Sequence, residues 1–165
     1  YRVEFKTNFL LVGTSNPCPC GMLYEGNCKC SNIEIERYTK KLSGPILDRI
    51  DLIVQIKRLN EEELVNSKKG ESSVEIRKRV IKAREIQFKR FKETRTNSTM
   101  TQEELKKYCD IKDEDKRFLI SALENLKISA RVYDKILKIA RTIADLEGKE
   151  ELERKHLLEA ISFKK

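Results

Sequence analysis

Four cysteines lie within thirteen residues of this chain, as two Cys-x-Cys pairs separated by seven residues: Cys18, Cys20, Cys28 and Cys30. Thiolates are soft ligands, and four of them at about 2.3 Å from one ion form the tetrahedral shell of a structural Zn²⁺ site. Such a shell leaves no open position for a substrate, so the pattern predicts a structural zinc ion. Because Cys-x-Cys is tighter than the common spacing, unpaired thiols and disulfides formed in air are the alternatives.

Polar residues also follow a short apolar run at 9–12, which stops at Gly13 and leads to Thr14, Ser15 and Asn16. A buried parallel strand with such an end usually terminates at the ligand-binding edge of an α/β sheet. The amide of Asn16 can donate to a phosphate oxygen and accept from water at the same time. The other interpretation is that Asn16 only begins an Asn-Pro turn at a strand exit.

Arg49 stands just before a second strand-like run, at 50–56. A guanidinium stays charged and can bind two phosphate oxygens through its planar fork. An amide at one strand end and an arginine beside the next strand therefore suit an enzyme that handles phosphates. An intramolecular ion pair of Arg49 with Asp48 or Asp51 is the alternative.

Longer phrases connect these residues: LVGTSNPCPCG, RYTKKLSGPILDRIDL and ISARVYDKILKIARTIADLEG. Together with the cysteine pairs they resemble the second half of the ATPase core in the magnesium-chelatase-like AAA+ family, in particular its competence ComM/YifB-type branch. The resemblance extends from about residue 9 to residue 163. It implies the end of an α/β parallel sheet, with a Cys-rich insert at 18–30, followed by an all-α helical lid domain.

The resemblance also implies a role for three polar residues. Asn16 matches sensor 1, which contacts the γ-phosphate and orients the attacking water. Arg49 matches the arginine finger, which enters the nucleotide site of a neighbouring subunit and is worth roughly 10³ to 10⁵ in turnover. Arg131 matches sensor 2, which reads the nucleotide from the lid; a surface pair with Asp134 is its alternative. A finger that acts on a neighbour implies a ring-shaped homo-oligomer, expected to be a hexamer.

The motifs that grip nucleotides are missing. The chain has no G-x-x-x-x-G-K-[ST] phosphate loop and no strand that ends in paired acidic residues for Mg²⁺. We therefore expect the residues that bind ATP and Mg²⁺ to precede Tyr1 in a longer protein. The intact protein is then expected to be an ATPase, and this fragment alone is expected to be inactive.

Composition sets independent bounds. Among 165 residues, 38% are charged, 7% are aromatic and none is Trp, so the core must be built from Leu, Ile and Val. No apolar run approaches the roughly 18 residues of a membrane span, and no signal peptide opens the chain. We expect a cytoplasmic protein without membrane contact, in which the five cysteines are thiols or metal ligands.

The order of elements divides the chain into a core part at 1–60, a linker at 61–72 within a polar stretch, and a helical lid at 73–165. Ser31 with Glu34 forms a capping box and predicts a helix at 32–41. In the lid, helices are predicted at 73–94, 102–109, 114–126, 130–147 and 154–163, from start signals such as Thr101 with Glu104. Gly148 should end the fourth of these helices.

Positive charge is concentrated between residues 68 and 95, which hold eleven Lys and Arg against four Glu. On a helix, Lys78, Lys82, Lys89 and Lys92 would form one stripe. Such a stripe could follow a nucleic-acid backbone, or it could simply be a solvated helix face.

Five other residues in the lid look structural. Phe88 and Phe91 are predicted to lie in the core rather than to stack on bases. His156, the only histidine, is expected at the surface, and Arg141 with Asp145 is expected to be an i,i+4 surface pair.

Three functions follow from these observations. The leading one is an ATP-driven motor that acts on DNA, in the branch migration of recombination intermediates during competence. The second is a magnesium-chelatase-type motor subunit that drives metal insertion into a porphyrin. The third belongs to another class: a zinc-stabilised module that binds nucleic acid without catalysis.

Overall fold

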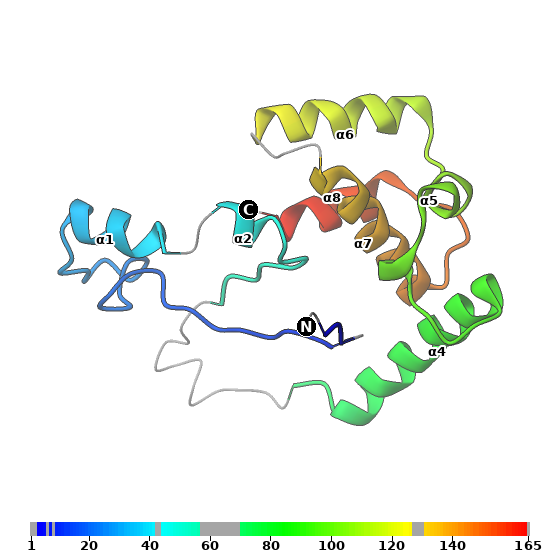
Figure 1. The fold of residues 1–165 in the computed structure, drawn as a ribbon, viewed down its shortest axis with the longest axis horizontal. Helices are drawn as coiled ribbons and strands as arrows, with labels where there is room; N and C mark the ends of the chain where they lie inside the picture. The colour runs from blue at the N-terminus through cyan, green and yellow to red at the C-terminus, as the bar shows by residue number, and fades with distance from the viewer. Residues whose placement is uncertain are drawn as a thin grey trace. The chain divides into compact units, whose positions relative to one another are not determined.

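A computed structural model describes residues 3–5, 7, 9–41, 44–56, 70–126 and 131–164, with only the backbone of Gly44, Pro45 and Arg131. The chain forms two compact units, Tyr1–Leu47 and Asp48–Lys165 (Figure 1). The predicted linker at 61–72 lies for the most part outside the described residues.

The first unit contains two short helices, α1 (Asn32–Thr39) and α2 (Gly44–Leu47). The predicted capping box starts α1: the Ser31 hydroxyl accepts the Glu34 amide at 3.3 Å, and the Glu34 carboxylate accepts the Ser31 amide at 2.8 Å. Hydrogen bonds from the Ser31 amide and the Ser31 hydroxyl to the carboxylate lower the pKa of Glu34. The prediction of a helix here is confirmed, and α1 ends two residues before the predicted end at 41.

The two predicted strands are absent, because the described residues contain no strand. In the first run Phe9 and Leu10 are 74% and 87% exposed, and in the second run Ile56 is 85% exposed. A strand is stable only when a neighbouring strand completes its backbone hydrogen bonds. The α/β part of the predicted fold is therefore not found in the described residues.

The second unit is all-helical, as predicted for the lid. Its elements are α4 (Ser73–Phe91), the 3₁₀ turn η1 (Asn97–Thr99), α5 (Gln102–Tyr108), α6 (Asp113–Asn125), α7 (Arg131–Glu147) and α8 (Arg154–Ser162). All five predicted helices are present, and their ends agree with the predictions to within three residues.

Local capping explains most of these ends. Ser72, one residue before the predicted start, caps α4 by accepting the Glu75 amide at 3.3 Å. Lys92 ends α4 in the left-handed region at φ 57°, where a residue other than glycine is uncommon. Gly148 ends α7 at φ 71°, as predicted.

Helix α7 is the centre of the second unit and packs against α4, η1, α5 and α8 (Figure 1). Its residues Ile136, Ala140 and Ala144 are fully buried. This agrees with the apolar residues around most of its circumference, which require neighbours on several sides. No described helix is long and apolar enough to cross a membrane.

The two phenylalanines of α4 differ in their surroundings. Phe91 is buried and meets Tyr108 of α5 edge to face, with ring centroids 5.9 Å apart. Phe88 is 51% exposed, so the prediction that it belongs to the core is wrong. The buried residues of α4 are Ala83, Gln87 and Phe91, which are four residues apart and form one stripe; Phe88 lies beside this stripe, one residue after Gln87.

Candidate functional site

The four clustered cysteines bring their sulfur atoms together, all within 4.8 Å of one another. Cys18 and Cys20 are 3.5 Å apart, Cys18 and Cys28 are 3.7 Å apart, and Cys20 and Cys28 are 3.6 Å apart, measured between Sγ atoms. A tetrahedron with metal–sulfur bonds of 2.3 Å has edges of about 3.8 Å. The four thiols could therefore hold a metal ion with little movement.

Two glycine turns shape the loop that carries the cysteines. Gly21 and Gly26 have φ values of 80° and 75°, which residues with a side chain rarely adopt. The Gly21 amide donates to the Cys18 carbonyl at 3.0 Å, which closes a tight turn around the first pair. Reversal of the chain at Gly26 then brings the second pair back to the first.

Backbone amides make the cluster suitable for thiolates. The amides of Met22 and Lys29 lower the pKa of the Cys20 thiol to about 6. At Cys30 the amide of Cys20 favours the thiolate, but desolvation and the neighbouring thiols outweigh it and raise the pKa to about 12. Four close thiols cannot all ionise by themselves, whereas a divalent cation stabilises every thiolate.

Disulfides, one of the alternatives, are not formed. All five cysteines are free, and the sulfur separations of 3.5 to 3.7 Å are well beyond the roughly 2.05 Å of a disulfide bond. Cys109 lies apart from the cluster, buried in the second unit with its Sγ 3.8 Å from the Met100 sulfur.

Asn16 is exposed and lies directly before the cysteine loop. With Thr14, Ser15 and Tyr38 of α1 it lines a shallow hollow on the first unit. A side chain added at Gly21 would place its Cβ 3.8 Å from the Asn16 amide carbon, so the glycine turn and the asparagine are neighbours. The position predicted to sense phosphate thus lies beside the cysteine loop.

Arg49 and Arg131 both belong to the second unit. The side chain of Arg49 is exposed, and its backbone carbonyl accepts a hydrogen bond from the Lys135 ammonium at 2.8 Å. Lys135 also pairs with Asp51 at 2.9 Å. Arg131 is the first residue of α7, one turn before Lys135.

Two further contacts attach the residues after Arg49 to the end of the chain. The Lys164 ammonium donates to the Ile50 carbonyl at 2.5 Å, and the Ile53 amide donates to the Phe163 carbonyl at 2.9 Å. Burial and the nearby Lys135 lower the pKa of Lys164. Sequence reasoning missed these contacts because they join residues about a hundred positions apart, and no local pattern marks them.

Both parts of the chain match family models. Residues 1–64 match the model described as magnesium chelatase, subunit ChlI, and residues 70–164 match the model of the ChlI C-terminal region. The chain belongs to the magnesium chelatase ChlI family.

Several relatives cover nearly the whole chain. It is 38% identical to competence protein ComM of Haemophilus influenzae over 99% of its length. It is 39% and 37% identical, again over 99% of its length, to the uncharacterized proteins YifB of Salmonella typhimurium and Escherichia coli. In each case the match spans 32% of the relative. The chain therefore corresponds to about a third of each of these proteins.

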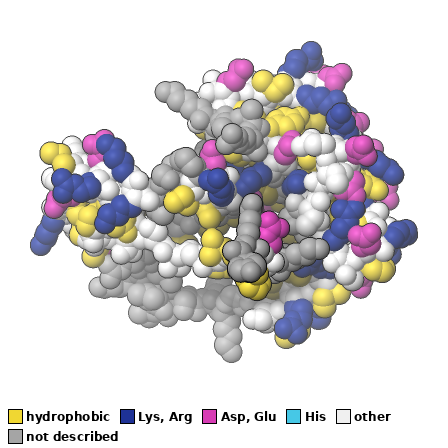
Figure 2. Space-filling view, viewed as in Figure 1, with side chains coloured by type: hydrophobic (Ala, Val, Ile, Leu, Met, Phe, Trp, Pro, Cys, Tyr) yellow, Lys and Arg dark blue, Asp and Glu magenta, His cyan; other side chains and the backbone are white. Residues whose placement is uncertain are grey.

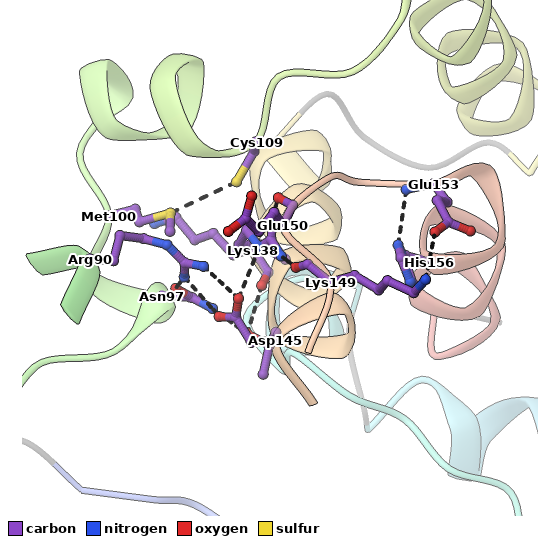
Figure 3. A network of polar contacts seen from close by, with 12 residues as sticks. Arg90, Asn97, Met100, Cys109, Lys138, Asp145, Lys149, Glu150, Glu153 and His156 are labelled. Carbon is purple, nitrogen blue, oxygen red and sulfur yellow. Dashed lines mark hydrogen bonds and ion pairs between the residues drawn. The ribbon is translucent and has the colours of Figure 1, made fainter. Parts of the chain in front are cut away.

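The lid of this family member contains a buried polar network centred on Asp145 (Figure 3). Asp145 is 1% exposed, and its carboxylate accepts hydrogen bonds from the Arg90 guanidinium at 2.5 and 2.7 Å. It also accepts from the Asn97 amide at 2.8 Å and from Arg141 Nε at 3.1 Å. One carboxylate thus joins α4, η1 and α7.

The prediction of a surface pair for Arg141 and Asp145 is therefore wrong. Arg141 is 2% exposed, and burial lowers the pKa of its guanidinium. It donates to the carbonyls of Lys149 and Glu150, the latter at 2.6 Å, and so holds the loop between α7 and α8. The spacing i,i+4 is the same for exposed and buried pairs, and the burial follows from the packing around α7.

His156 is also buried, with 0% exposure, so its predicted surface position is wrong. Its Nδ1 accepts the Glu153 amide at 2.9 Å, which caps the start of α8 (Figure 3). Its Nε2 lies 3.2 Å from the Glu147 carboxylate. With Nδ1 as acceptor, Nε2 carries the proton and donates to Glu147. His156 therefore joins the end of α7 to α8.

Proposed function

We propose that this chain is the sensor, finger and lid portion of a ring-forming AAA+ ATPase. The observation that carries the proposal is the attachment of Arg49 to α7, whose first residue is Arg131. One rigid helical unit thus carries both arginines that the family pattern assigns to nucleotide handling. Arg49 itself is exposed.

Each proposed site residue has a separate task. Asn16 orients the attacking water, and Arg131 contacts the nucleotide of its own subunit. Arg49 reaches the neighbour's nucleotide, where a guanidinium stabilises the charge that develops on the transferred phosphoryl group. Mg²⁺ bound with ATP neutralises phosphate charge in such sites. Binding of ATP and Mg²⁺ is assigned to residues outside this chain, because it contains no phosphate loop.

The exposed apolar runs support a sheet that is completed by other parts of a longer protein. Leu10, Val12 and Val54 are between 65% and 87% exposed, although such side chains are usually buried in a sheet of this class. We propose that residues 9–13 and 50–56 become parallel strands when neighbouring strands are present.

A structural zinc ion is proposed at Cys18, Cys20, Cys28 and Cys30. The sulfur separations of 3.5 to 3.7 Å support it, because they are close to the edges of a zinc–thiolate tetrahedron. The ion would fix a loop that has few apolar contacts of its own, and it would keep Asn16 at a defined place relative to α1.

DNA is the proposed substrate of the motor. Lys78, Lys82 and Lys89 of α4 are exposed, and one relative is named as a competence protein. Figure 2 shows Lys and Arg side chains spread over the face in view rather than gathered in one patch. The exposed lysines along α4 could contact a phosphate backbone.

The test is ATP turnover by the full-length protein that contains this chain, with and without single-stranded and branched DNA. Arg49→Ala should abolish DNA-stimulated turnover, by roughly 10³-fold or more. Arg117→Ala, which removes an exposed arginine of α6, should leave turnover unchanged. A rate of ATP turnover that is the same with and without DNA would favour a chelatase-type motor. DNA binding without any turnover would favour the zinc-stabilised binding module.

A further inference from the structure

The segment 49–53, here called the finger segment, is held by the helical unit at three points. Lys135 of α7 donates to the Arg49 carbonyl at 2.8 Å and pairs with the Asp51 carboxylate at 2.9 Å. Lys164 donates to the Ile50 carbonyl, and the Phe163 carbonyl accepts a hydrogen bond from the Ile53 amide. The contact with Arg49 itself comes from Lys135, which lies within the first two turns of α7.

Lys135 contributes to the geometry of the finger segment more than to its stability. An ion pair with Asp51, whose side chain is 64% exposed, adds little to stability. The same ammonium, however, bridges a carbonyl and a carboxylate two residues apart. Charge-assisted hydrogen bonds of this kind fix direction as well as distance. They set the direction in which the Arg49 side chain leaves the backbone.

Helix α7 can transmit a displacement from Arg131 to Lys135 and so to the finger segment. Arg131 and Lys135 are four residues apart, about 6 Å along the helix axis. Val132 and Ile136, on the same turns, are 2% and 0% exposed, so α7 moves as a packed unit rather than bending locally. A displacement of the helix at Arg131 must therefore also displace Lys135 and the finger segment.

We propose that Lys135 is a positioning residue that couples the nucleotide read by Arg131 in one subunit to the placement of Arg49 in the site of the next. The proposal rests on the proposed function, and it adds a route for communication around the ring. Such a route requires two sites and one element that both of them bias. Here the sites are those of Arg131 and Arg49, and the element is α7 with Lys135.

The chain offers a matched control on the same helix. Lys138, three residues further along α7, also donates to a backbone carbonyl, that of Ser98 at 3.0 Å. This hydrogen bond attaches Lys138 to η1 and not to the finger segment. Lys135→Met and Lys138→Met therefore each remove one charge and one hydrogen bond to a backbone carbonyl, but only the first removes the contacts with Arg49 and Asp51.

The first experiment measures hydrogen exchange in the full-length protein, with ATP analogue and with ADP. Lys135→Met should speed exchange of the amides at 50–53 by about tenfold and leave those at 136–144 unchanged. In the wild-type protein and in Lys138→Met, exchange at 50–53 should differ between the two nucleotides. In Lys135→Met this difference should disappear. Unchanged exchange in Lys135→Met would overturn the proposal, because the contact would then not hold the segment.

The second experiment measures ATP turnover by the same variants. Lys135→Met should lower kcat with little change in KM, should bring the Hill coefficient for ATP toward 1, and should make Arg49→Ala nearly without further effect. Lys135→Arg should restore part of kcat. Wild-type turnover and cooperativity in Lys135→Met would overturn the proposal. Absence of turnover in the wild-type protein would instead overturn the proposed function and with it the coupling, while the exchange data would still decide whether Lys135 holds the finger segment.

Discussion

Asp145 is shared by two guanidinium groups in the interior of the lid, and all three side chains are at most 11% exposed. Buried charges of this kind are tolerated only when each is paired and hydrogen-bonded. The pairing here is complete, because Arg141 uses its remaining donors on the carbonyls of Lys149 and Glu150. The network therefore holds α4, η1 and the loop after α7 in one arrangement.

Replacement of the Asp145 carboxylate should strongly destabilise the lid. Asp145→Asn keeps the shape of the side chain but leaves two buried arginines without a counter-charge, so the free energy of unfolding should fall by about 3 to 5 kcal/mol. Asp113→Asn is the control, because its side chain is 87% exposed; its effect should stay below about 1 kcal/mol. Urea denaturation followed by helical circular dichroism measures both, and equal effects would contradict the assigned role.

Glu104 makes the stability of the lid depend on pH. Hydrogen bonds from Arg95 and from the Thr101 amide lower the pKa of Glu104 from 4.5 to about 2. The ionised carboxylate thus stabilises the folded state fully above about pH 4.5, and this stabilisation is lost as the pH falls toward 2. Melting temperatures of the wild type and Glu104→Gln should differ at pH 7 and converge near pH 2. A difference that is constant with pH would show that the charge of Glu104 is not involved.

At the scale of elements, α4 is buried on one side only. Phe91 lies between the edge of Tyr108 and the Arg95 guanidinium, which is 4.2 Å from its ring centroid. Phe88, one turn earlier, is half exposed. The exposed residues Val74, Ile76 and Ile81 continue the apolar surface toward the start of the helix.

The two phenylalanines should respond differently to truncation. Phe91→Ala removes a buried ring and should cost about 3 to 5 kcal/mol of unfolding free energy. Phe88→Ala should cost less than about 1 kcal/mol, because its ring already contacts water. Urea denaturation measures both losses, because a shift of the unfolding midpoint at an unchanged m-value reports a change in the free energy of unfolding. A large loss from Phe88→Ala would mean that this side of α4 is covered in solution.

At the scale of the whole molecule, the cysteine cluster and the lid lie in different units. Because all four clustered cysteines belong to Tyr1–Leu47, we expect the lid to keep its fold without a metal bound at the cluster. The cysteine loop cannot, since it has few buried apolar residues beyond Cys18.

Removal of the metal should therefore have a local effect. The purified protein should contain about one zinc ion per chain, Cys28→Ser should lower this content, and Cys109→Ser should not. A chelator should speed hydrogen exchange at residues 17–31 and leave the thermal unfolding of the helices unchanged. Metal content that is the same in Cys28→Ser and the wild type, or zero in both, would exclude the proposed site.

The elements that could be predicted from the sequence are those set by local interactions. The capping boxes at Ser31 and Thr101 and the glycine at 148 act within a few residues, so the helices agree closely with their predictions. The cysteine cluster was also predictable, because thirteen residues contain all of its ligands. The runs at 9–13 and 50–56 were not, because a strand depends on partners elsewhere.

By itself the sequence determined the family, the helical lid, the metal-binding pattern and the identities of Asn16, Arg49 and Arg131 as candidate nucleotide residues. Only the tertiary structure decided that Arg141, Asp145 and His156 are buried and that Lys135 holds the carbonyl of Arg49. The physical reason is distance along the chain. Burial and the contacts that fix a segment arise where residues far apart in sequence meet, and such meetings leave no periodic or local mark in the amino-acid sequence.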